Sequence, residues 1–166
     1  MKHFRNLATM LAIAILVIFS SCNKKRGSDP EPQGKATSEE LTFGTWVPKT
    51  GGITNNGTPR DEWVGFTLKF TANTTAYDGG SYTSGPLPQI TDIDRVWKTS
   101  GTWAFGKNGD QLILGTIYRD NDLSIPVAIT VSSANGGTLR MEFTVPVLGA
   151  RTAGIEGTWV FDMILQ

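Results

Sequence analysis

Residues Ser100 to Leu114 read SGTWAFGKNGDQLIL, and this stretch decides the fold that the sequence predicts. It opens with Gly101-Thr102-Trp103, in which threonine suits a pleated surface and tryptophan suits a core. The pair Asn108-Gly109 follows, and it accepts the positive φ angles of a tight hairpin turn. An apolar run comes next. The stretch therefore predicts two antiparallel strands, Lys98 to Gly106 and Gln111 to Tyr118, joined by a hairpin.

Alternation of apolar and polar residues recurs along the rest of the chain. It is clearest from Phe66 to Thr71 and from Leu139 to Val145, and no long stretch has helical periodicity. Such alternation is typical of strands with one buried face. Turn signals then separate six further strands. These are expected at Leu41 to Val47, Val64 to Thr71, Thr74 to Asp78, Leu123 to Val131, Thr138 to Val147 and Gly157 to Leu165.

Every second connection between these eight strands is a tight turn. Of the others, Pro48 to Trp63 and Gly79 to Trp97 are long, Leu148 to Glu156 is intermediate, and Arg119 to Asp122 is a short polar turn. In an up-and-down meander alternate connections share one end, so hairpins close one end and long loops surround the other. We therefore predict an all-β, eight-stranded antiparallel up-and-down barrel with no major helix. A flattened β-sandwich is the alternative. Pro126 and Pro146 predict that their strands splay at the loop-rich end, because proline donates no ladder hydrogen bond.

The triplet Gly-Thr-Trp occurs at residues 44–46, 101–103 and 157–159. The residues that follow each copy share no convincing similarity, so we interpret the triplets as strand residues of one fold and not as an internal repeat. The first and last strands meet when a barrel closes. This predicts that the first and third triplets lie near one another.

The N-terminal residues have the features of an export signal. A basic start precedes an apolar run from Leu7 to Phe19, which is shorter than the ~20 residues that a membrane span needs. Phe19-Ser20-Ser21-Cys22 resembles the bacterial lipobox, and this resemblance implies cleavage before Cys22 and lipidation of its thiol. Polar residues rich in proline and glycine follow. We expect a signal peptide at residues 1–21, a lipidated flexible tether at 22–38 and the barrel domain at 39–166.

Composition narrows the chemistry. Cys22 is the only cysteine, so no intrachain disulfide can form. The only histidine, His3, leaves with the signal peptide, which excludes histidine-based triads and histidine-ligated metals. Without Lys2 and Arg5, 13 basic residues face 15 acidic ones, a net charge of −2. This charge does not favour nucleic acid as a partner. We expect no enzyme, no cofactor and no metal site.

Aromatic residues are the candidate ligand-binding positions. Five of them fall in or beside the expected loop-rich end: Trp63, Tyr77, Tyr82, Trp97 and Tyr118. Either they stack on an apolar or sugar ligand, or they plug the barrel under the loops. Nine other large side chains are expected in the core, where they could fill it completely. They are Trp46, Phe66, Phe70, Trp103, Phe105, Met141, Phe143, Trp159 and Phe161.

Four segments of the chain carry a family resemblance: Phe43 to Trp46, with its Gly-x-Trp pattern, and residues 66–77, 100–114 and 128–143. The first is similar to the Gly-x-Trp of the first lipocalin strand, and together the four resemble the lipocalin-like, calycin-type domains of bacterial lipoproteins. With the lipobox, this resemblance implies a palmitate-bearing protein anchored in the outer membrane, which faces the periplasm or the cell surface. It also implies non-catalytic binding of a small apolar ligand.

Two other functions stay open: a structural or protein-interaction module with a filled barrel, and a glycan-binding accessory lipoprotein. An apolar cavity of ~300 Å³ or more under the long loops favours the carrier. A filled interior with exposed apolar loop residues favours the interaction module.

Overall fold

The computed structural model of the chain describes residues 31–120, 122–132, 137–148 and 154–166. Residues 32–166 form one compact unit, which is described here by itself. Cys22 and the expected signal peptide lie outside the described residues.

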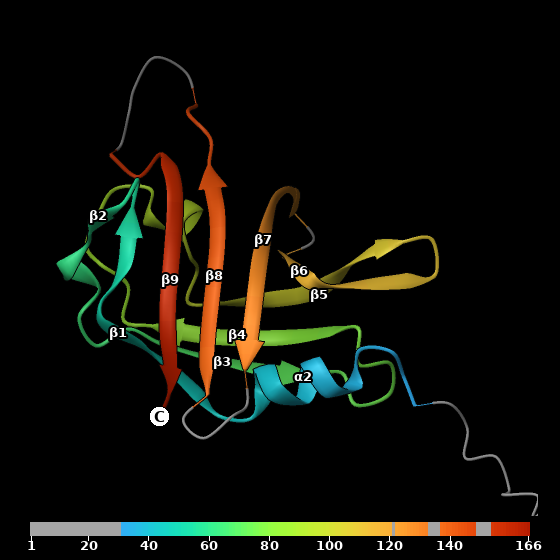
Figure 1. Cartoon of the computed structure of the whole chain (residues 1–166). Coiled ribbons are helices and arrows are strands. Elements are labelled where there is room, and N and C mark those ends of the chain that lie inside the picture. Colours follow the sequence, from blue (N-terminus) through green and yellow to red (C-terminus); the bar gives the residue numbers. More distant parts are fainter. Residues whose placement is uncertain (1–30, 121, 133–136, 149–153) are drawn as a thin grey trace, which may run out of the picture. The chain divides into compact units, whose positions relative to one another are not determined.

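Within the described residues, nine strands form one antiparallel sheet (Figure 1). The strands are β1 (Thr45–Asn55), β2 (Thr58–Pro59), β3 (Thr67–Ala72), β4 (Gly79–Gly85), β5 (Ser100–Asn108), β6 (Gln111–Arg119), β7 (Asp122–Ser132), β8 (Thr138–Val145) and β9 (Gly157–Leu165).

The sheet closes into a barrel because β1 pairs with β9 as well as with β3. Along the closing seam, Trp46 lies opposite Leu165 and Asn55 lies opposite Trp159. The other strands pair in chain order from β3 to β9, while β2 pairs only with β1 and stays outside the ring. The predicted eight-stranded up-and-down barrel is therefore confirmed.

Helix α2 (Lys35–Thr42) lies at the hairpin end of the barrel (Figure 1). Leu41 of this helix is fully buried, and its carbonyl accepts a hydrogen bond of 2.8 Å from Trp46 Nε1. Just before the helix, the Gln33 side chain exchanges hydrogen bonds of 3.3 and 2.8 Å with the backbone of Leu112, beside the β5–β6 hairpin. The helix thus covers the base of the barrel. The described residues of the four connections that follow β1, β4, β6 and β8 lie at the opposite end, the rim.

The strand predicted from Leu41 to Val47 is wrong in its first part, because Leu41 and Thr42 belong to helix α2. The segment expected to be a flexible tether also ends early, since the helix begins at Lys35 and Ser38 is fully buried. Only Ala36 and Leu41 are apolar in this helix, which is too few for a detectable helical period. Its order comes from docking on the barrel.

The strand predicted from Thr74 to Asp78 is also wrong. These residues form the β3–β4 turn, and β4 occupies positions 79–85, where a glycine-rich loop is expected. The two glycines that suggested a loop allow close strand approach instead. A Cβ atom on Gly80 would lie 1.8 Å from the carbonyl oxygen of Thr71. The strand β1 likewise continues to Asn55, through residues 48–53, where its register with β9 shifts.

The three Gly-Thr-Trp triplets contribute residues to β1, β5 and β9, as predicted. The expected closeness of the first and third is wrong. Trp46 pairs opposite Leu165, whereas Trp159 pairs opposite Asn55 at the other end of the same seam. Six residues of β9 separate the two levels, which is roughly 20 Å of strand. Trp46 therefore lies near the base of the barrel, and Trp159 lies near the rim.

The two prolines act as predicted. The β7–β8 ladder runs from the Ser132–Thr138 pair to the Ala128–Glu142 pair and stops before it reaches Pro126. Pro146 follows the last residue of β8. The two strands separate toward the rim because neither proline can donate a ladder hydrogen bond.

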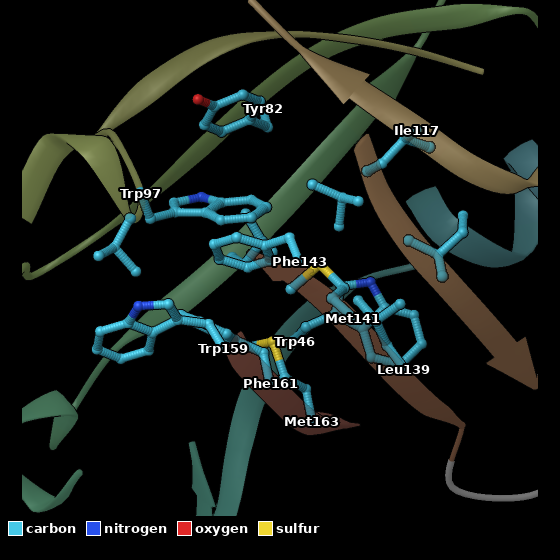
Figure 2. Packing of buried hydrophobic residues seen from close by; sticks show 14 of the residues in the cluster. Trp46, Tyr82, Trp97, Ile117, Leu139, Met141, Phe143, Trp159, Phe161 and Met163 are labelled. Carbon is cyan, nitrogen blue, oxygen red and sulfur yellow. The ribbon is translucent and has the colours of Figure 1, made fainter. Parts of the chain in front are cut away.

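The barrel interior is filled by one cluster of buried side chains (Figure 2). Strand β8 shows how they are placed, since every second residue from Leu139 to Val145 is buried. Ring centroids within the cluster lie 5.0–6.3 Å apart, which is contact distance for aromatic pairs. All nine residues predicted for the core are at most 3% exposed.

Candidate functional site

Described residues of three rim connections fold inward and plug the barrel. The plug consists of Trp63, Val96, Trp97 and Ile155, each at most 2% exposed. Trp63 ends the short 3-10 helix η1 (Asp61–Trp63), and Val96 and Trp97 follow a second one, η2 (Ile93–Arg95). The amide groups of Val96 and Trp97 both donate to the carbonyl of Ile93, at 2.9 and 3.0 Å. This tight turn directs both side chains into the interior.

The two plug tryptophans pack on the same phenylalanine. The Trp63 ring lies 5.0 Å from the Phe161 ring, and the Trp97 ring lies 5.8 Å from it. Trp97 also contacts the rings of Tyr82 at 5.5 Å and Phe143 at 5.9 Å (Figure 2). Side chains therefore occupy the upper half of the barrel, where a barrel-bound ligand would enter.

Arg119 is the one charged residue buried in this interior among the residues that the structure describes. It alternates with buried Ile117 along β6, so it points inward and is only 7% exposed. Its guanidinium lies 4.3 Å from the Trp97 ring and 4.9 Å from the Phe143 ring, which is cation–π distance. Its Nη1 donates a 2.6 Å hydrogen bond to the carbonyl of Val96. Burial lowers the pKa of Arg119, because a charged group is less stable away from water.

Asp120, the next residue, organises a hydrogen-bonded group beside this arginine. Its carboxylate accepts from the Tyr82 hydroxyl at 3.1 Å and from the amide of Thr102 at 3.1 Å. It also lies 3.3 Å from the ammonium group of Lys98. Burial, and then the charge of Asp120, raises the pKa of Tyr82. Gly101 makes room for this arrangement, since a Cβ atom there would meet the Asp120 carboxylate.

A cleft of about 330 Å³ opens at the rim over Arg119 and Asp120. Its side chains are of three kinds: basic, acidic or hydroxyl-bearing, and apolar. The rim cleft is lined by Asp94, Arg95, Lys98, Arg119, Asp120, Asp122, Ser124, Ile125, Pro146 and Leu148. Two of these acids differ in setting. Asp120 has the partners given above, whereas Asp122 is exposed and accepts hydrogen bonds from the hydroxyl and amide of Ser124, which lower its pKa.

A second hollow lies where the barrel wall opens between β1 and β3. Only Thr45–Lys69 and Trp46–Leu68 pair across these strands, and they diverge toward the rim. A groove of about 570 Å³ follows the opening, lined mainly by residues 47–53 and 63–67. It contains no buried charged side chain, so its chemistry is less specific than that of the rim cleft.

The structure separates the five predicted aromatic positions. Trp63, Tyr82 and Trp97 meet at or under the plug and are buried. Tyr77 lies at the hairpin end, in the β3–β4 turn, so its expected place at the loop-rich end is wrong. Tyr118 is near the rim, but it alternates with inward Ile117 and Arg119 and lies on the outer face of β6, half-buried.

The sequence-based candidates miss Arg119 and Asp120. The polar run at residues 119–122 predicts only a turn, which hides the inward position of its first residue. The signal that could have found Arg119 is the two-residue period of a strand. Arg119 is two residues after Ile117, so both side chains lie on the same, inward face of β6.

Among the described residues, no three acidic, histidine or cysteine side chains are grouped so that they could hold a metal ion. No helix in the described ranges has both the length and the hydropathy that a membrane crossing requires. Comparison with family models, with curated proteins and with solved structures gave no match.

Proposed function

We propose that this protein is a membrane-anchored, non-catalytic binding module, in which the filled barrel is a scaffold and the rim is the recognition surface. The anchor is the lipid on Cys22, which places the domain at the outer membrane, on its periplasmic or cell-surface side. The single observation that carries the proposal is the filled interior. It favours the interaction module over the carrier of a small apolar ligand.

The plug supports this choice. A ligand inside the barrel would have to displace both Trp63 and Trp97, which are 2% and 0% exposed and pack on Phe161. Removing such side chains from a packed core leaves a cavity and costs several kcal/mol, on the order of 3–5 for each aromatic residue. A small apolar ligand offers no comparable gain, because it replaces apolar contacts that are already made.

The rim, in contrast to the filled interior, exposes apolar side chains to solvent. Four of the five most exposed large apolar side chains among the described residues lie in or beside rim connections. These four are Val64, Leu123, Val147 and Leu148, with exposed fractions of 60–83%. Exposed apolar residues gathered at one end of a domain are typical of recognition surfaces.

Native mass spectrometry of the protein extracted from its own envelope tests the scaffold. We expect the mass of the lipidated chain with no apolar molecule bound in stoichiometric amount. A co-purifying fatty acid or similar ligand would make the barrel a carrier.

Metabolic labelling with palmitate tests the anchor. The wild-type chain should incorporate label and fractionate with membranes, and Cys22→Ser should lose both properties. Label that persists in Cys22→Ser would overturn the anchoring at this residue.

A further inference from the structure

Arg119 is a buried cation with no carboxylate of a described residue within ion-pair distance. Within the described part of the chain it forms no ion pair, and its Nε atom has no hydrogen-bond partner. The cation–π contacts and the Val96 carbonyl stabilise the guanidinium only in part. A buried charge is costly unless it is paired, so an arginine in this setting indicates a missing anionic group.

The other two basic residues of the rim cleft already have carboxylate partners. Arg95 lies 3.4 Å from Glu156 and also donates to the carbonyl of Pro146. Lys98 lies 3.3 Å from Asp120. Arg119 is therefore the basic side chain of the rim cleft that has no described carboxylate in ion-pair contact, although the charges of Asp120 and Asp122 act on it from farther away.

The outer part of the rim cleft has a different character. Asp94, Asp122 and Ser124 are exposed there and present oxygen atoms that accept hydrogen bonds. Carboxylates repel a simple anion, but they bind hydroxyl groups well because a charged acceptor strengthens the hydrogen bond. Ile125, Pro146 and Leu148 add an apolar wall. The volume of about 330 Å³ is at the lower end for ligand pockets, which suits a molecule of roughly monosaccharide size.

We propose that the rim cleft binds a small hydroxylated carboxylic acid, of which a hexuronate is the type. Its carboxylate pairs with Arg119, its hydroxyl groups donate to Asp94 and Asp122, and its apolar ring face lies against Ile125 and Leu148. This inference rests on the proposed function, since it names the ligand class of the rim. A neutral sugar would leave Arg119 without a counterion, and a simple anion would gain nothing from the outer carboxylates.

Isothermal titration of the purified full-length protein in detergent tests the proposal with three probes at constant ionic strength. They are D-glucuronate, D-glucose and acetate. We expect saturable binding of glucuronate and at least about tenfold weaker binding of the other two, because each lacks one of the two recognised features. The Trp97 ring lies against Arg119, so its fluorescence should change with glucuronate alone.

Variants locate the site. Arg119→Gln should weaken glucuronate binding at least about tenfold, since it removes the only charge that pairs with the ligand. Asp94→Asn does not alter the barrel interior and should weaken glucuronate binding about threefold. This variant keeps the test valid if Arg119→Gln fails to fold. Arg140→Gln is the matched control. Arg140 forms an exposed pair with Asp162 on the barrel wall, and its loss should leave binding unchanged.

The outcomes distinguish the two proposals. Equal binding of glucose and glucuronate, absence of saturable glucuronate binding, or an equal effect of Arg140→Gln would overturn the ligand class or its site. A fourth arm with a fatty acid reports on the scaffold. Stoichiometric fatty-acid binding would overturn the filled-barrel function, whereas failure of glucuronate alone would leave that function standing.

Discussion

The guanidinium of Arg119 lies 4.3 Å from the centroid of the Trp97 ring, so a strand residue and a loop residue together close the barrel. Trp97 fills the space that a ligand would occupy, and Arg119 covers its face with a charge. The backbone reinforces this contact, because Arg119 Nη1 donates to the carbonyl of Val96, the residue before Trp97. The pair joins the scaffold to the rim cleft, since Arg119 also lines that cleft.

Arg119→Met should leave the free energy of unfolding unchanged or raise it. Methionine has a similar length, and it replaces a buried cation whose desolvation outweighs the attraction of the nearby Asp120 and Asp122 charges. Urea denaturation followed by tryptophan fluorescence measures the change. A loss of more than about 2 kcal/mol would contradict this expectation, because it would mean that the contacts of Arg119 with Trp97, Phe143 and the Val96 carbonyl outweigh the cost of burying its charge.

Trp97→Ala should destabilise the protein by about 3–5 kcal/mol, since it removes a fully buried aromatic side chain from a filled interior. Phe43→Ala is the matched control, because Phe43 is 80% exposed, and its effect should stay within about 0.5 kcal/mol. Chemical denaturation of both variants measures their free energies of unfolding. Equal effects would contradict the plug.

The strands of the barrel could be predicted because period-2 alternation directly reports which face is buried. Gly157–Leu165 has the same bounds in the structure as in the prediction, and four of its inward residues are apolar at every second position. Helix α2 could not be predicted in this way. Its one fully buried apolar side chain, Leu41, acquires its role only from the barrel on which it docks.

The site was harder to predict than the fold. Trp97 reaches the interior from a loop, where no periodicity tells the direction of a side chain. Arg119 opens a polar run that has the composition of a turn, and only the finished register places it inside. Trp63 and Trp97 were found by residue type, but type alone does not separate a plug from a ligand platform. That distinction depends on packing with Phe161, which is distant in sequence.

Gly101→Ala should destabilise the protein by about 1–3 kcal/mol, because the new Cβ atom would collide with the Asp120 carboxylate and lie 2.7 Å from the Tyr82 hydroxyl. Gly115→Ala in β6 is the control. The nearest atom to its new Cβ is 4.0 Å away, so its effect should stay within about 0.5 kcal/mol. Thermal unfolding of the two variants gives the comparison. If Gly101→Ala leaves the stability unchanged, the hydrogen-bonded group around Asp120 is not held by close packing.

Tyr82→Phe should change how stability depends on pH. Burial raises the pKa of the Tyr82 phenol in the folded protein, while in the unfolded chain the phenol keeps its ordinary value of about 10. Below about pH 10 both states hold the proton, so this group adds no pH dependence there. Above it the unfolded chain loses the proton first, and the wild type should lose up to about 1.4 kcal/mol of stability per pH unit from this group.

Urea denaturation at pH 8 and at pH 11 separates this contribution from other groups that titrate in alkali. At pH 8 the variant should be less stable by about 1 kcal/mol, because it lacks the hydrogen bond to Asp120. At pH 11 the difference should shrink or reverse, because phenylalanine has no proton to lose. Parallel declines in the two proteins would show that the Tyr82 hydroxyl reaches solvent in the folded state, and that the Tyr82–Asp120 contact under the rim cleft is not closed to water.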